Sequence, residues 1–265
     1  MSSTTATTIP LQRGVLYGPV ISRRLGRSLG LNILPDEIKV CSMDCRYCQY
    51  SWTGILSRQP KQFAHFLPSR DSVAAGIEER LMGLASAGTP PDTITFSGNG
   101  EATLHPDFPG IVSDVVAARD AHAPRCRTAI LSNSTTIHRK DVRSATLLLD
   151  DPILKLDTGR EETFRLLNRP ARGVRFEDLL MGLQAIGPRI TLQALFVQGR
   201  VNNSTDEEVR DWAKAVAEIK PRSVQIYTLD RGPADRGLLP VPLVRLQAIA
   251  SLLKQRTGIA AMAFD

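Results

Sequence analysis

Short apolar runs alternate with amphipathic segments from Leu31 onward, and this alternation constrains the fold more than any other feature. Apolar residues recur at three-to-four spacing in the longer segments, which is typical of helices with one buried face, whereas the short runs are typical of strands. Ser69 or Asp71 can cap the first helix, and Thr205 followed by Glu208 is a capping-box pattern. The pattern predicts strands over 31–34 (with an extension toward 40), 93–96, 128–131, 153–156, 190–197 and 223–229, and helices over 69–85, 106–118, 139–147, 176–186 and 205–219.

Six strands joined by helical segments predict an α/β fold with parallel strands. Crossovers between parallel strands are right-handed, which leaves a doubly wound sheet or a full or partial barrel. Six repeats favour a partial (β/α)6 TIM-like barrel with the helices outside, and 265 residues suit one such domain. Ligands bind at the C-terminal ends of the strands in either architecture, so we expect the chemistry just after each apolar run.

The two ends of the chain depart from this repeat. Residues 1–12 begin with a Thr- and Ser-rich run without periodicity and are predicted to form a flexible tail. Residues 238–265 contain one amphipathic helix and a short strand, predicted as an extension packed on the barrel of residues 13–237. The sequence has no run of eighteen apolar residues and no secretory signal, so we expect a cytoplasmic protein without a membrane partner.

Three of the four cysteines fall within eight residues, which is how metal ligands are spaced. Cys41, Cys45 and Cys48 form C-x3-C-x2-C directly after the first predicted strand. Soft thiolate ligands select iron-sulfur clusters or zinc. Three thiolates on a four-iron cluster leave one iron open to another ligand, as a catalytic metal site requires.

Other interpretations of these cysteines are open. Positions i, i+4 and i+7 share one helical face, so the three could be buried core residues. A zinc site could be completed by His65 or Asp44, although structural zinc normally has four closed ligands. An electron-transfer cluster without catalysis would normally need a fourth cysteine ligand, and no other cysteine is near in the sequence.

Charge gives a weaker indication of partners. The net charge of +6 permits an anionic partner such as tRNA or a phosphorylated metabolite. Aromatic residues are only 5% of the chain, so no base-stacking platform is visible. Arg23, Arg24 and Arg27 precede the first predicted strand and either border the site, where they would meet an anionic substrate, or belong to a solvated loop.

The cysteine segment resembles the signature of the radical S-adenosylmethionine (SAM) superfamily, C-x3-C-x-aromatic-C, with Tyr47 at the aromatic position. Further segments resemble an uncharacterised Fe-S oxidoreductase group of that superfamily, related to wyosine-type and activase-type enzymes; these segments are YGPVISRRLGRSLGLN, ITFSGNGEATLHPDF, ILSNST, KLDTG, NRP and LFVQG. The resemblance implies a partial (β/α)6 barrel and two cofactors, a 4Fe-4S cluster and SAM. It also implies that reductive cleavage of SAM yields a 5'-deoxyadenosyl radical, which takes hydrogen from a substrate.

Polar residues at the strand ends are the candidate cofactor ligands. Glycines let a backbone approach a ligand closely, and a carboxylate can meet an ammonium, so the 98–101 segment could hold the amino group of SAM, as the resemblance implies. Asp157 is suited to ribose hydroxyls and Lys155 to a carboxylate. The resemblance puts Tyr47 beside the adenine. Each residue could instead cap a helix, form a turn or pack in the core. The candidates are Tyr47, Gly98, Asn99, Gly100, Glu101, Ser132, Asn133, Lys155, Asp157 and Gln193, with Cys41, Cys45 and Cys48 as metal ligands.

The resemblance implies an enzyme with an unidentified substrate, which could be a small molecule, RNA or a protein. A one-electron donor such as flavodoxin or ferredoxin is the expected partner. Wyosine-type enzymes carry additional cysteines for a second cluster, and none precedes Cys41. The alternatives are a glycyl-radical activase and a cluster carrier without catalysis. No catalytic residue is assigned.

Overall fold

An eight-stranded sheet forms the centre of the computed structural model, which describes residues 8–264. The strand order is β1-β2-β5-β6-β7-β8-β10-β12. Every neighbouring pair is parallel except β1 and β2, which form an antiparallel hairpin. The strands are β1 (Leu16–Ser22), β2 (Gly26–Leu31), β5 (Thr93–Phe96), β6 (Arg127–Ser132), β7 (Asp151–Lys155), β8 (Thr191–Leu195), β10 (Ser223–Tyr227) and β12 (Ala261–Ala263).

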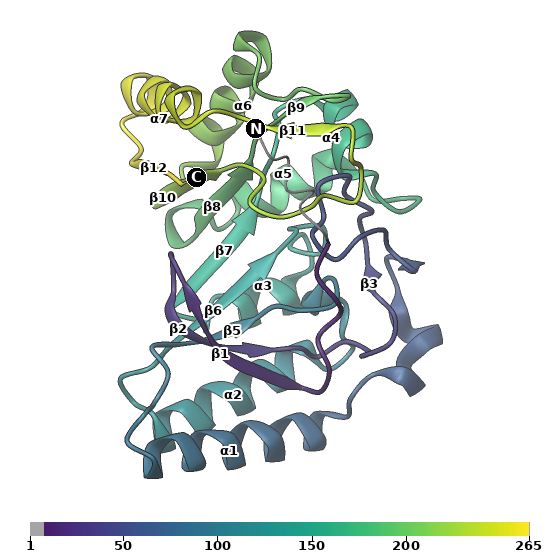
Figure 1. Ribbon diagram of the computed structural model, residues 1–265, viewed down its shortest axis with the longest axis vertical. Helices are drawn as coiled ribbons and strands as arrows, with labels where there is room; N and C mark the ends of the chain where they lie inside the picture. The colour runs from purple at the N-terminus through teal and green to yellow at the C-terminus, as the bar shows by residue number, and fades with distance from the viewer. Residues whose placement is uncertain (1–7, 265) are drawn as a thin grey trace, which may run out of the picture.

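The strand order distinguishes a barrel from a doubly wound sheet. In a doubly wound sheet the order reverses at a switch point, whereas here the strands follow the chain throughout. Right-handed crossovers then put the helices on one face, and the opposite face curves into an interior (Figure 1). The predicted partial (β/α)6 barrel is confirmed, with β12 as a further parallel strand beyond the six.

Helices and short strands fill the connections. The helices are α1 (Arg70–Ser86), α2 (Phe108–His122), α3 (Lys140–Thr146), α4 (Glu161–Asn168), α5 (Phe176–Gln184), α6 (Asp206–Ile219) and α7 (Leu243–Thr257), with 3-10 turns at η1 (Pro60–Phe66), η2 (Ala102–Leu104) and η3 (Gly187–Arg189). Two small sheets pair β3 (Val40–Cys41) with β4 (Ile55–Leu56), and β9 (Val197–Gly199) with β11 (Leu238–Pro240). None of the helices in the described part is long and apolar enough to cross a membrane.

The N-terminal strands differ from the prediction. The first barrel strand is Gly26–Leu31 rather than 31–34, and the β1 strand before it was not predicted. The prediction leaves this segment outside any strand, but Gly30 pairs with Tyr17, and a Cβ at position 30 would stand 2.1 Å from the Tyr17 ring. The glycine is therefore a packing requirement.

Other boundaries agree more closely. The remaining barrel strands lie within two residues of their predicted ends, except that the predicted 190–197 strand stops at Leu195, with Val197 opening β9. Helix α4 was not predicted. Ser69 and Thr205 cap α1 and α6 as expected, because their side chains accept from the N–H groups of Ser72 and Glu208.

The ends of the chain pack against the barrel. Residues 1–7 of the predicted flexible tail lie outside the described residues. Within the rest of that tail, the N–H of Ile9 donates to the carbonyl of Gln49 at 2.8 Å. At the other end, α7 packs on β12, and β12 pairs with β10.

Trp212 on α6 anchors a helix to the sheet. Its ring is fully buried, meets Phe196 edge-on with 5.2 Å between centroids, and donates from Nε1 to the carbonyl of Leu156 at 2.9 Å. These contacts tie α6 to the segments that follow β7 and β8, where the site lies.

We expect Trp212→Ala to lower the free energy of unfolding by about 3–5 kcal/mol, because it leaves a cavity and an unpaired carbonyl. Urea unfolding followed by circular dichroism measures this. The matched change Met181→Ala, at an exposed position on α5, should cost less than about 0.5 kcal/mol. Equal losses in the two variants would contradict this account of the core.

Candidate functional site

The three clustered cysteines lie on the loop that begins at β3, and backbone bonds join this loop to the glycine loop after β5. The N–H of Val40 donates to the carbonyl of Asn99 at 3.0 Å, and the N–H of Glu101 donates to the carbonyl of Val40 at 3.1 Å. Gly100 adopts φ +136°, and a Cβ there would stand 1.7 Å from the Val40 carbonyl oxygen. Only glycine fits this approach, so the predicted cysteine and glycine motifs form one structural unit.

The thiols of this loop are reduced and shielded. Cys41 and Cys45 are buried and Cys48 is half-buried, and none is in a disulfide. Burial raises the pKa of Cys41 to about 12 and that of Cys45 to about 11. Side-chain amides approach two sulfurs: Asn133 Nδ2 lies 3.4 Å from Cys41 Sγ, and Asn168 Nδ2 lies 3.5 Å from Cys45 Sγ. Such donors stabilise thiolates once they form.

Lys39 places a positive charge beside these thiols. Its ammonium is buried and donates to the carbonyl of Ser51 at 2.8 Å. Burial alone would lower the pKa of Lys39, but its interactions with the nearby sulfurs, first that of Cys48, raise it overall. Lys39 is not among the predicted site residues, although its place two positions before the first clustered cysteine was a visible signal.

The geometry disfavours a single zinc ion. Within residues 8–264, no group of three or more His, Cys, Asp or Glu side chains is placed to hold one metal ion. Asp44 instead accepts from the N–H of Thr53 at 2.7 Å and pairs with Arg169 at 3.2 Å, while His65 is exposed and packs against Phe66. A cluster of several irons suits this loop better, because each thiolate then binds a different iron.

Glu101 is a buried carboxylate without a cationic partner among the described residues. Its side chain is 1% exposed and accepts from the side chain and N–H of Thr103 at 2.6 and 3.2 Å, from Ser132 Oγ at 2.9 Å and from the N–H of Asn133 at 2.6 Å. Burial raises the pKa of Glu101, and these hydrogen bonds oppose the rise. A ligand with an ammonium group would supply the missing positive charge.

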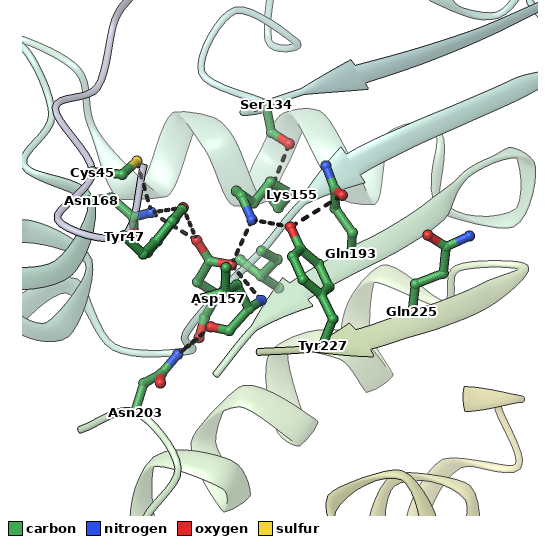
Figure 2. A network of polar contacts seen from close by, with 12 residues as sticks. Cys45, Tyr47, Ser134, Lys155, Asp157, Asn168, Gln193, Asn203, Gln225 and Tyr227 are labelled. Carbon is green, nitrogen blue, oxygen red and sulfur yellow. Dashed lines mark hydrogen bonds and ion pairs between the residues drawn. The ribbon is translucent and has the colours of Figure 1, made fainter. Parts of the chain in front are cut away.

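Asp157 is the centre of a second network, which Figure 2 shows. One oxygen accepts from Tyr47 Oη at 2.5 Å and Asn168 Nδ2 at 2.8 Å. The other accepts from the ammonium of Lys155 at 3.2 Å and from the N–H of Leu195 at 2.9 Å. Four donors of the chain itself therefore satisfy this carboxylate, which joins the cysteine loop to α4, β7 and β8.

Lys155 extends the network across the barrel. Its ammonium donates to Tyr227 Oη at 2.8 Å, and Tyr227 Oη donates to Gln193 Oε1 at 3.3 Å (Figure 2). Burial alone would lower the pKa of Lys155, but the charge of Asp157, and next the contact with the Tyr227 hydroxyl, raise it, so the side chain stays a cation. A protonated lysine binds anions and is not a nucleophile.

One cavity of about 550 Å³ opens onto most of the predicted residues, a size suited to a cofactor and part of a substrate. Its lining includes the three cysteines and eight of the predicted cofactor ligands, which are Tyr47, Gly98, Gly100, Glu101, Ser132, Asn133, Lys155 and Gln193. Asn99 and Asp157 do not line it. Lining residues not predicted as ligands include Lys39, Arg24 and Tyr227.

Asn99 faces away from the cavity. Its amide nitrogen donates to the carbonyls of Gln12 and Pro35, both at 2.8 Å, and its oxygen accepts from the N–H of Gln12 at 2.8 Å. The side chain thus holds the N-terminal segment against the glycine loop. Asn168, by contrast, contacts Cys45 and Asp157 but was not predicted as a site residue. It is the first residue of the NRP segment, to which no role was assigned.

The chain resembles known proteins over most of its length. A family model described as the Radical SAM superfamily matches residues 38–213. The chain is 32% identical over 220 residues to GTPase Obg of Brachyspira hyodysenteriae, which covers 82% of this chain and 30% of that protein. It is 30% identical over 249 residues to a UPF0026 protein of Methanocaldococcus jannaschii, which covers 92% of this chain and 72% of that protein. The chain thus spans less than a third of the first relative.

A solved structure has a similar fold. A radical SAM methyltransferase from Sphaerobacter thermophilus superposes with a TM-score of 0.65 at 14% identity, over 89% of this chain and 65% of that chain. At this identity the likeness shows the barrel fold alone.

In the metal-free protein we expect iodoacetamide at about pH 8 to modify Cys48 first, because Cys41 and Cys45 are buried thiols with raised pKa values. Mass spectrometry of peptides after timed quenching measures the order, and the urea-unfolded chain is the control. Faster labelling of Cys41 than of Cys48 would contradict this picture.

The raised pKa values of Cys41 and Cys45 also make the stability of the fold depend on pH. In the unfolded chain these thiols lose their protons at a pKa of about 8.5. Their contribution to the free energy of unfolding is therefore full below about pH 8.5 and is lost as the pH rises through their pKa values in the folded protein.

Glu101→Gln is isosteric, yet we expect it to lower the free energy of unfolding by about 1–3 kcal/mol. Each carboxylate oxygen accepts a backbone N–H, so the new amide must turn its NH2 toward one of them. Thermal unfolding measures the loss. The exposed change Glu162→Gln should leave stability unaltered, and a Glu101→Gln variant as stable as wild type would show that the carboxylate is not held this way.

Proposed function

The chain belongs to the radical SAM superfamily, and we propose that it is an enzyme in which Cys41, Cys45 and Cys48 hold a 4Fe-4S cluster and Glu101 helps to bind SAM. The bound cluster would supply the electron that cleaves SAM into methionine and a 5'-deoxyadenosyl radical, and this radical takes a hydrogen atom from the substrate. The residues around the cavity bind, orient and shield these groups.

One observation carries the proposal: three reduced thiols and an uncompensated buried carboxylate open into the same cavity. The thiols suit a cluster with one open iron. The Glu101 carboxylate suits the amino group of SAM, because an ammonium restores the charge balance that no described cation supplies. Gly98 and Gly100 allow the close packing of this loop: a Cβ at position 98 would stand 2.6 Å from Asn32 Oδ1, and one at position 100 would stand 1.7 Å from the Val40 carbonyl oxygen.

The other lining residues would hold the rest of the cofactor. Lys155 is a cation facing the cavity, and we assign it to a carboxylate group. Tyr47 lies beside the cysteines with its ring 4.9 Å from the Lys155 ammonium, in reach of the adenosyl part. Asp157 is fully occupied by the chain's own donors, so we assign it to positioning Tyr47 and Lys155 rather than to direct contact with ribose.

A separate electron donor is part of the proposal. The only cysteine outside the loop is Cys126, which precedes β6 at the opposite end of the barrel strands and lies outside the cavity lining. The chain therefore offers no ligand set for a second cluster, and we propose a one-electron donor protein such as flavodoxin or ferredoxin. The substrate is proposed to be a molecule of which a small part enters the cavity beside SAM.

Anaerobically reconstituted protein with dithionite and SAM is expected to release 5'-deoxyadenosine and methionine in equal amounts, measured by liquid chromatography and mass spectrometry. Cys48→Ala should abolish both cluster retention and cleavage, because it removes one of three ligands. Cys126→Ala is the matched control and should keep both. Intact SAM in the presence of a fully reduced cluster would overturn the proposed function and leave a cluster carrier.

A further inference from the structure

The turn between β1 and β2 reaches across the open side of the barrel. Figure 1 shows the hairpin extending from one edge of the sheet toward the strands at the other edge. Arg24, in this turn, donates from Nη1 to Gln193 Oε1 at 3.2 Å and to Gln225 Oε1 at 3.0 Å. Its guanidinium carbon lies 5.0 Å from the centre of the Tyr227 ring. A residue early in the chain thus enters the cavity beside β8 and β10.

The charge of Arg24 is not balanced. Within the described part of the chain, its side chain contacts two amide oxygens and an aromatic ring but no carboxylate. Arg46 and Arg119, which are also sheltered from solvent, each pair with a carboxylate at 2.7 Å. Asp230, an acid that also lines the cavity, pairs with Arg23 at 3.3 Å. A guanidinium that is held in a cavity by neutral groups favours an anion there.

The residues that hold Arg24 form an ordered row. Lys155 pairs with Gln193 in the register of β7 and β8, and Gln193 pairs with Gln225 in the register of β8 and β10. Three neighbouring strands therefore present one ammonium and two amides at the same level. The guanidinium is oriented by this row before any ligand arrives, which lowers the entropic cost of binding.

The Arg24 end of the cavity is separate from the cysteine end. The Lys155 ammonium lies 4.9 Å from the ring centre of Tyr47, next to the cysteines, whereas the Arg24 guanidinium carbon lies 5.0 Å from the ring centre of Tyr227, on β10. The methionyl part of SAM must lie at the cysteine end to reach the cluster and Glu101. An anion at Arg24 would therefore belong to another molecule.

We propose that Arg24, oriented by Gln193 and Gln225 over the ring of Tyr227, binds an oxyanion of the substrate, either a carboxylate or a phosphate. This inference rests on the proposed function, because it assumes that a substrate binds in this cavity and gives up a hydrogen atom to the 5'-deoxyadenosyl radical. It assigns the substrate to the class of molecules that carry a carboxylate or a phosphate, and Arg24 would fix the position of that group.

Isothermal titration calorimetry on the anaerobically reconstituted, SAM-loaded protein tests this with two probes, inorganic phosphate and succinate. We expect one probe to bind saturably with one site per chain, and the tighter probe identifies the oxyanion. Arg24→Gln should weaken that binding about tenfold or more, since it removes charge-assisted hydrogen bonds. Arg27→Gln is the matched control on the same hairpin and should bind like wild type, because Arg27 lies outside the cavity lining and donates to the carbonyl of Thr89.

Two results would overturn the inference: wild-type protein that binds neither probe, or Arg24→Gln that binds as tightly as wild type. Cleavage of SAM without substrate separates this from failure of the proposed function. Arg27→Gln, whose residue lies outside the cavity lining, should keep the wild-type rate of that cleavage. Loss of cleavage in wild type and variant alike would count against the proposed function, while the binding measurement would still decide the anion site.

Discussion

The carboxylate of Asp157 determines how the cysteine loop sits against the barrel. Its donors come from four different elements, namely Tyr47 of the cysteine loop, Asn168 at the end of α4, Lys155 of β7 and the backbone of Leu195 at the end of β8. A carboxylate taken out of water is tolerated only when donors satisfy it. Asp157 can therefore be buried only when all four elements are in place around it, and these elements form much of the wall of the cavity.

Two charged residues of the cavity lining make no ion pair within the chain that the structure describes. Glu101 at one end is an acid without a cation among the described residues, and Arg24 at the other is a cation without an acid. Lys155 stands between them, compensated by Asp157. In a poorly solvated space such unbalanced charges select ligands of opposite sign. The arrangement suits two molecules bound side by side, with an ammonium of one at the Glu101 end and an anion of the other at the Arg24 end.

Local patterns predicted the parts of this site that are local. Cysteine spacing identified one loop that lines the cavity, and glycines just after a predicted strand identified the loop that carries Glu101. The sequence could not show that Glu101 faces the cavity and Asn99 faces away from it, because the direction of each side chain depends on how the backbone turns at Gly100. Nor could it place Arg24, whose partners lie 169 and 201 residues away. The strand Gly26–Leu31 was not predicted, because glycine has a low propensity for strands. In the folded chain the Tyr17 ring packs on the backbone at Gly30, and the sequence pattern does not show this contact.

The backbone bonds of the cysteine loop also determine which parts of the chain position the cysteines. Besides the two bonds between Val40 and the glycine loop, the N–H of Arg46 donates to the carbonyl of Leu167 at 3.0 Å, and the N–H of Ala171 donates to the carbonyl of Ser42 at 2.9 Å. The loop is therefore held from two sides, by the glycine loop after β5 and by the end of α4 with the residues that follow it. A substitution that shifts α4 would move the cysteines even though it lies more than a hundred residues away from them in the sequence.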